Sequence, residues 1–163
     1  MLLSASQALW FLPFVLPICV WVAWSDLATM KIPNKAVLAL IAVFVVIGMI
    51  AFPFSVWLWQ LPHFFVVLAI GFLLTILGVM GAGDAKFAAA AAPFVLLPDA
   101  TNIIAILGIS ALFGFVSHRL ARATPIRKLV PHWESWERKK DFPMGYPLAL
   151  TLVAYLALAA SGY

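Results

Sequence analysis

Apolar segments separated by short polar or turn-forming stretches divide this chain along its whole length. Of its 163 residues, 66% are hydrophobic and 10% are charged, against about 25% charged in a typical soluble domain. A helix needs about 20 apolar residues to cross the hydrocarbon layer, and fewer where its ends are shielded. We therefore predict one all-α, polytopic membrane domain over residues 1–163. The six predicted transmembrane helices are Ala8–Trp24, Lys35–Phe52, Leu61–Met80, Ala85–Leu97, Ile103–Ser117 and Tyr146–Ala160.

The basic residues predict the orientation of these helices. With six spans, the first, third and fifth loops lie on one side, and they hold all ten Lys and Arg of the chain. These residues are Lys31, Lys35, Lys86, Arg119, Arg122, Arg127, Lys128, Arg138, Lys139 and Lys140. Positive charge stays cytoplasmic, so we expect the N-terminus and the C-terminus both to be extracytoplasmic. One missed or extra helix would scatter the charges over both sides.

Two aspartates lie beside the predicted spans, in a chain that has six acidic residues in all. Asp26 follows the first span, and Asp84 lies between the third and the fourth. Acidic residues next to membrane spans are costly and therefore point to function. The predicted topology puts both on the cytoplasmic face, where two carboxylates could share one proton as in an aspartyl protease.

The local sequence predicts how each aspartate is presented. Residues 26–34 are predicted to form a short cytoplasmic connection, in which Pro33 suits the first turn of the next helix. Gly81 and Gly83 permit a tight, non-helical turn, from which Asp84 would project into a cavity.

The remaining polar residues suggest no other chemistry. Asp99 is interpreted as a turn and helix cap, Cys19 as an apolar filler, and His118 as an interfacial residue. In the 118–142 loop, a short interfacial helix is predicted, with Leu129, Val130, Trp133 and Trp136 on one face and Arg138, Lys139 and Lys140 near lipid headgroups. No cluster has metal-ligand spacing, so we expect neither a metal nor another cofactor. The net charge is +4, but the basic residues flank membrane helices and are not interleaved with aromatic side chains on which bases could stack, so we do not expect nucleic acid as a partner.

Two segments together form a specific sequence signature. They are Asp26 followed by Lys31-Ile32-Pro33-Asn34, and Gly81-Ala82-Gly83-Asp84-Ala85-Lys86 two spans later. This combination resembles the type IV prepilin peptidases, membrane aspartyl proteases of the Gly-x-Gly-Asp class, in the short form that serves Tad/Flp-type pili. The resemblance implies that Asp26 and Asp84 are catalytic. It also implies supporting positions at Gly81, Gly83, Lys86, Lys31, Pro33 and Asn34. The segment Pro143-Met144-Gly145 is similar to the family's Pro-aromatic-Gly, with Met144 in place of the aromatic residue and only a packing role expected.

The same resemblance predicts an enzyme of the bacterial inner membrane that cleaves the basic leader of a single-span prepilin at the cytoplasmic face. Longer members carry paired Cys-x-x-Cys motifs and also methylate the new pilin N-terminus; this chain has one cysteine and is expected to cleave without methylating. Its oligomeric state is not predicted. Three alternatives stay open: an archaeal preflagellin-type peptidase, a small proton or cation transporter that uses the two aspartates, and a structural scaffold.

Overall fold

The structure, a computed structural model, describes residues 1–138 and 141–162 and is all-helical over these ranges. Its α-helices are α1 (Ala5–Thr29), α2 (Asn34–Ala51), α3 (Phe54–Ile76), α4 (Ala82–Ala91), α5 (Ala100–Ala123) and α6 (Gly145–Ala160). Short 3-10 turns follow α4 as η1 (Ala92–Phe94) and η2 (Leu97–Asp99), and precede α6 as η3 (Pro125–Leu129) and η4 (Glu134–Trp136). The all-α class predicted from the sequence is confirmed.

Four segments of the described chain are long and apolar enough to cross a membrane: α1, α2, α3 and Leu97–Ala123, which contains α5. Helix α6 is apolar but has 16 residues, and α4 has 10, which at 1.5 Å per residue gives α4 a length of about 15 Å. Six membrane crossings therefore stay a prediction.

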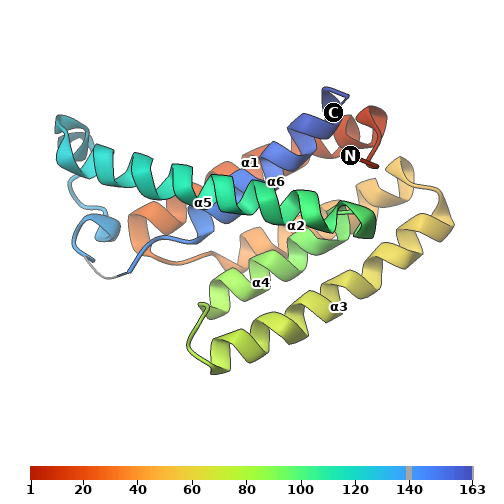
Figure 1. The fold of residues 1–163 in the computed structure, drawn as a ribbon, viewed down its shortest axis with the longest axis horizontal. Coiled ribbons are helices and arrows are strands. Elements are labelled where there is room, and N and C mark those ends of the chain that lie inside the picture. Colours follow the sequence, from red (N-terminus) through yellow and green to blue (C-terminus); the bar gives the residue numbers. More distant parts are fainter. Residues whose placement is uncertain (139–140, 163) are drawn as a thin grey trace.

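Successive helices run back and forth between two ends of the molecule (Figure 1). Both termini lie at one end, together with the α2–α3 and α4–α5 connections. The α1–α2, α3–α4 and α5–α6 connections, which carry the basic residues, lie toward the opposite end. This alternation agrees with the loop pattern from which the orientation was predicted.

Helix α1 packs against α6 and α2, and its contact with α6 is the most extensive of any helix pair. Its buried residues recur every three or four positions, as Ala8, Phe11, Val15, Cys19, Val22 and Asp26, which is the period of one helix face. Phe11 meets Phe94 edge-on, with ring centroids 5.0 Å apart, and also contacts Phe44 and Phe52. Cys19 is buried, as the interpretation of it as an apolar filler requires.

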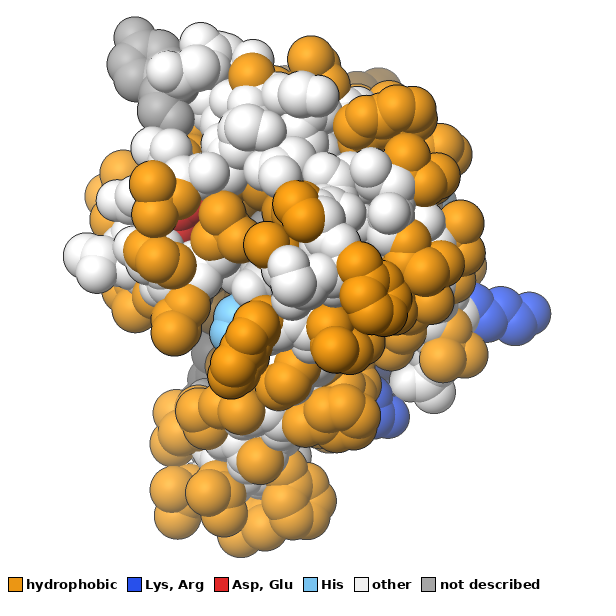
Figure 2. All heavy atoms as spheres, turned by 90° about the vertical axis from the view of Figure 1, so that its right-hand side faces the viewer, with side chains coloured by type: hydrophobic (Ala, Val, Ile, Leu, Met, Phe, Trp, Pro, Cys, Tyr) orange, Lys and Arg blue, Asp and Glu red, His pale blue; other side chains and the backbone are white. Residues whose placement is uncertain are grey.

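Much of the outer surface is apolar. Helix α3 buries Gln60 and Gly71 and exposes large hydrophobic side chains such as Phe65, Phe72 and Leu73. The end that carries the termini shows mostly hydrophobic side chains, with Lys and Arg side chains only at its margin (Figure 2). Such a surface suits lipid rather than water. Helix α4 differs, because Ala85, Phe87, Ala89 and Ala90 are buried among α2, α3 and α6, as predicted for the fourth segment.

Asp99 ends the 3-10 turn η2 and is the N-cap residue of α5, as interpreted from the sequence. Its carboxylate makes no capping bond to the backbone of α5; instead, it accepts hydrogen bonds from the N–H groups of Leu2 (3.0 Å) and Leu3 (3.3 Å). The Tyr155 hydroxyl donates to the same oxygen at 2.8 Å. Asp99 thus ties the N-terminal segment to α6 at the end of the molecule where both termini lie.

The interfacial helix predicted in the 118–142 loop is not formed, so that prediction is wrong. Residues 118–123 continue α5, and the following residues form two separate 3-10 turns, with Trp133 and Trp136 buried and Leu129 exposed. Trp136 stacks on the buried His118 with ring centroids 4.9 Å apart, and Trp133 meets Trp24 of α1 at 5.0 Å. His118 is therefore part of a buried aromatic cluster.

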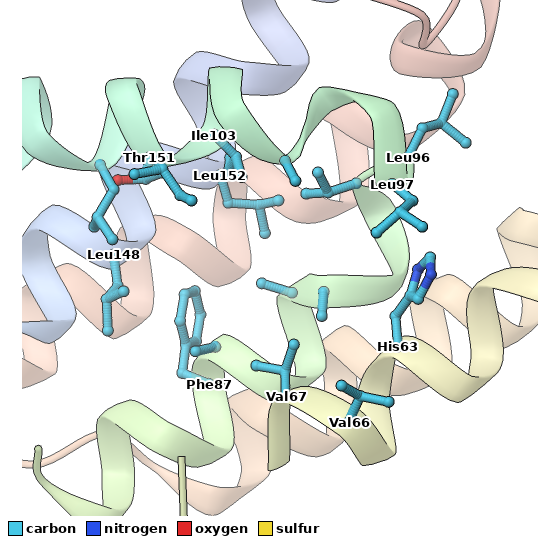
Figure 3. A pocket seen from close by; sticks show the side chains of 17 residues that line it. His63, Val66, Val67, Phe87, Leu96, Leu97, Ile103, Leu148, Thr151 and Leu152 are labelled. Atoms are coloured by element: carbon cyan, nitrogen blue, oxygen red, sulfur yellow. The ribbon is translucent and has the colours of Figure 1, made fainter. Parts of the chain in front are cut away.

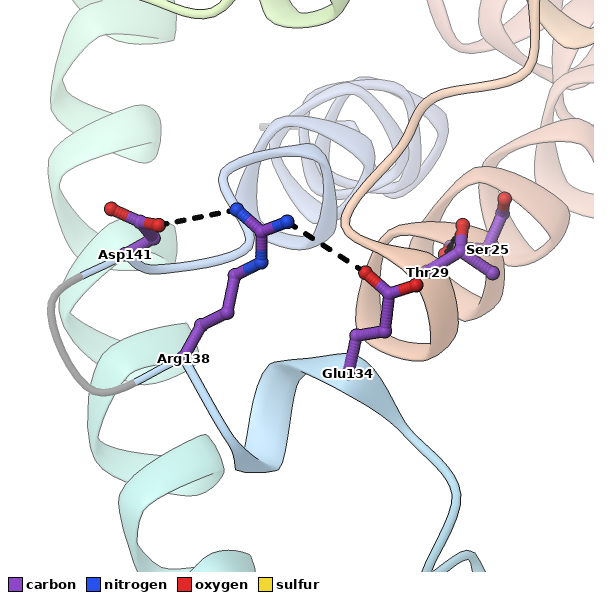
Figure 4. Close-up of polar contacts among 5 residues, drawn as sticks. All are labelled: Ser25, Thr29, Glu134, Arg138 and Asp141. Carbon is purple, nitrogen blue, oxygen red and sulfur yellow. Dashed lines mark hydrogen bonds and ion pairs between the residues drawn. The ribbon is translucent and has the colours of Figure 1, made fainter.

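The charged part of the loop is arranged around one arginine. Arg138 lies between Glu134 and Asp141, with nitrogen–oxygen distances of 3.9 and 3.4 Å (Figure 4). Lys139 and Lys140, predicted to lie near headgroups with it, are outside the described residues.

Candidate active site

Asp26 lies in the last full turn of α1, not in the connection that the sequence predicted. The helix continues to Thr29 and ends at Met30, whose φ of 54° turns the chain into the left-handed region. The Ser25 hydroxyl donates to the Lys31 carbonyl at 2.9 Å, which holds the α1–α2 connection against the end of α1. Within the helix, the Thr29 hydroxyl donates to the Ser25 carbonyl, also at 2.9 Å (Figure 4 shows the two side chains).

The Asp26 side chain is 4% exposed and is held by the start of α6. The backbone N–H of Tyr146 donates to its Oδ2 at 3.2 Å. A Cβ on Gly145 would lie 2.9 Å from the Asp26 Cγ and Oδ2, and also 2.9 Å from the Ile32 Cδ1. Only a residue without a side chain leaves room for this approach, so Gly145 lets the first backbone amides of α6 reach the carboxylate.

Asp84 lies in the first turn of α4, which begins at Ala82 with Gly81 as its N-cap. The predicted non-helical turn is therefore wrong for residues 82–84. An acidic residue in the first turn is favoured by the helix dipole. Gly83 faces Ile32, since a Cβ at position 83 would lie 3.5 Å from the Ile32 Cβ. Burial raises the pKa of Asp84 above its ordinary value, and a hydrogen bond from the backbone of Gly81 opposes the shift in part.

Both aspartates line one pocket of about 420 Å³. Its lining residues are Asp26, Met30, Lys31, Ile32, Asn34, Gly81, Ala82, Gly83, Asp84, Lys86, Phe142 and Met144. Seven of the eight site residues named from the sequence are among them; Pro33 is not, and instead forms the N-cap of α2. The Lys86 ammonium donates to the Asn34 side-chain oxygen at 3.4 Å across the pocket.

The sequence did not point to the contribution of α6. Met144 and Phe142 line the pocket, and Gly145 and Tyr146 hold Asp26, although only packing was expected from this segment. Its similarity to the family's Pro-aromatic-Gly was the one signal that could have found it.

The arrangement can perform acid–base chemistry. Two carboxyl groups in a partly dehydrated pocket cannot both ionise cheaply, so one can hold a proton while the other accepts one. Within residues 1–138 and 141–162, no group of three or more His, Cys, Asp or Glu side chains could hold a metal ion.

Comparisons with known proteins identify the family of this chain. Neither the comparison with curated proteins nor that with solved structures gave a match. The sequence pattern of the Type IV leader peptidase family matches residues 13–117, well over half of the chain and the part that contains Asp26 and Asp84. This multi-pass membrane protein therefore belongs to the type IV leader peptidase family, a family of proteases.

Proposed function

We propose that this protease is an aspartic endopeptidase in which Asp26 and Asp84 are the catalytic pair. The observation that carries the proposal is that the two carboxylates, 58 positions apart in sequence, line the same pocket. The first comes from α1 and the second from α4, so folding, not local sequence, assembles the pair.

The reaction requires one ionised and one protonated carboxyl group. The ionised group takes a proton from a water molecule as that water attacks the scissile carbonyl carbon. The protonated group donates a hydrogen bond to the developing oxyanion and then a proton to the leaving amine. Lys31 and Lys86 line the same pocket, where the Lys86 ammonium is bonded to Asn34, and they keep this part of the site polar.

The proposed substrate is a Flp-like type IV prepilin, whose basic leader is removed at the cytoplasmic face of the bacterial inner membrane. The positive residues of the described loops gather at the end of the molecule that holds the pocket, which supports this orientation through the positive-inside rule. The enzyme is proposed to cleave without methylating, because these 163 residues hold one cysteine, buried in α1, and no paired Cys-x-x-Cys motif.

Asparagine substitutions test the pair. Asp26→Asn and Asp84→Asn keep the side-chain shape but cannot exchange the proton, so each should lower prepilin processing at least about 100-fold, the low end of an acid–base contribution. Asp141→Asn is the matched control, since Asp141 lies on the exposed loop and does not line the pocket. Processing would be followed by the gel shift of the leader, with equal protein levels in the membrane. Normal cleavage by either pocket variant would overturn the assignment.

A further inference from the structure

A second hollow of about 300 Å³ lies among α3, α4, α5 and α6 (Figure 3). We call it the apolar groove. Its residues are His63, Val66, Val67, Phe87, Ala88, Ala91, Ala92, Val95, Leu96, Leu97, Ala100, Ile103, Ile104, Leu107, Leu148, Thr151 and Leu152. The Thr151 hydroxyl donates to the Pro147 carbonyl at 2.7 Å, so it offers the groove no free donor. His63 lies at the end where Leu97 also lies (Figure 3). The groove thus selects apolar ligands.

Two helices connect the apolar groove to the aspartate pocket. On α4, Asp84 is followed by the groove residues Phe87, Ala88 and Ala91, at the i+3, i+4 and i+7 positions of one helix face. On the chain entering α6, Met144 of the pocket is followed by Leu148 of the groove four residues on. The pocket and the groove therefore follow one another along α4 and along the chain entering α6.

The small side chains of the groove would let a helix pack closely against it. Ala88, Ala91, Ala92 and Ala100 line it, and small side chains let a neighbouring helix approach closely in a membrane. The exposed Ile104 and Leu97 lie along its length and would pack on that helix.

We propose that the apolar groove binds the apolar helical segment of the prepilin that directly follows the scissile bond. This inference rests on the proposed function. A single-span substrate whose bond lies at the aspartate pair must continue into the membrane from there, and α4, which holds Asp84 in its first turn, leads from the pocket into the groove. A lipid acyl chain would also match the apolar lining, but lipid binding would not explain why the groove adjoins the aspartate pocket.

Two matched pairs of variants test the groove. Ala91→Trp fills it, whereas Ala105→Trp places the same side chain on the exposed face of α5 outside it. In detergent-solubilised enzyme, Ala91→Trp should raise the KM for full-length prepilin tenfold or more, with kcat within about threefold, and Ala105→Trp should leave both unchanged.

The second pair of variants tests the groove at exposed positions, where a bulky side chain does not have to fit inside the fold. Ile104 and Ile109 are 68% and 70% exposed on α5, but Ile104 alone of the two lines the groove. A photoreactive benzoylphenylalanine at each position, in the Asp84→Asn background that keeps substrate uncleaved, should cross-link prepilin from position 104 and not from 109.

The outcomes separate the two proposals. Absence of cleavage by the unsubstituted enzyme would overturn the proposed function and this inference with it. Cleavage by that enzyme, together with equal kinetics for Ala91→Trp and Ala105→Trp, would overturn the groove alone. Cross-links from position 104 to lipid without prepilin, or equal prepilin cross-links from positions 104 and 109, would overturn it as well.

Discussion

Substitution of Gly145 by alanine tests the contact on which the geometry of Asp26 depends. The added Cβ would lie 2.9 Å from the Asp26 Cγ and Oδ2, so either the carboxylate or the start of α6 must shift. Asp26 is held by the Tyr146 N–H at 3.2 Å, and a shift of either partner lengthens that bond. A hydrogen bond to a charged group contributes about 1.5–3 kcal/mol, which corresponds to about 10- to 150-fold in rate if the bond is needed in the transition state.

We therefore expect Gly145→Ala to lower the single-turnover rate of prepilin processing about 10- to 150-fold. Because a donor to the ionised carboxylate favours ionisation, the acidic limb of the pH–rate profile should also move to higher pH. A merely structural role for Gly145 would not move that limb. The control is Gly108→Ala on α5, where an added Cβ meets nothing within 4 Å, and which should process prepilin at the unsubstituted rate.

A double variant distinguishes the carboxylate contact from packing. The Gly145 Cβ would also lie 2.9 Å from the Ile32 Cδ1, an atom that Ile32→Val removes. The rate of Gly145→Ala should stay low in combination with Ile32→Val, because the clash with Asp26 remains. Full recovery in the double variant would show that the defect came from Ile32, and a normal rate for Gly145→Ala alone would refute the positioning argument.

Three further predictions concern charge, orientation and chemistry. Because the pKa of Asp84 is raised by burial, the folded state keeps its proton at pH values where the unfolded state, with a pKa of about 3.9, has lost it; stability then falls as pH rises through this window. Asp84→Asn should thus melt higher than the unsubstituted protein at pH 7 and equally at pH 3, and equal melting at both pH values would contradict this. Reporter fusions should place the termini and the α2–α3 and α4–α5 connections outside, whereas a cytoplasmic C-terminus would show a miscounted span. Purified enzyme should cleave prepilin in the presence of a chelator and add no methyl group from a supplied donor; activity that is lost on metal removal and restored by zinc would refute the aspartyl mechanism.

The composition of the site could be predicted because its main signals are unusual in a membrane chain. Carboxylates beside apolar spans are rare, and the distribution of Lys and Arg predicted that Asp26 and Asp84 share one end of the molecule. The pocket that both line confirms that they meet. Their catalytic role stays a prediction.

The local backbone at both aspartates was predicted less well. The sequence predicts that the first span ends before Asp26, but Asp26 continues the buried face of Cys19 and Val22 at helical spacing, so burial carries the helix further than its polar residues suggest. Gly81 and Gly83 predict a non-helical turn, because a glycine costs about 1 kcal/mol relative to alanine inside a helix. Helix α4 nevertheless begins at Ala82, where the acidic Asp84 in the first turn is favoured by the helix dipole.

The contribution of α6 could not be derived from spacing, because 119 positions separate Asp26 from Gly145 and no side-chain chemistry at Gly145 or Tyr146 marks the contact. What joins them is the backbone: the packing of α1 against α6 brings the first amides of α6 to a carboxylate in the last turn of α1. The Asp99 contacts with Leu2, Leu3 and Tyr155 connect the same two ends of the chain at the far end of the bundle. The N-terminal segment and α6 are thus joined near both ends of their packing, and a shift of α6 along α1 would have to break hydrogen bonds at Asp26 and at Asp99 together. The aspartate pocket therefore depends on the whole bundle, from the first residues of the chain to its last helix.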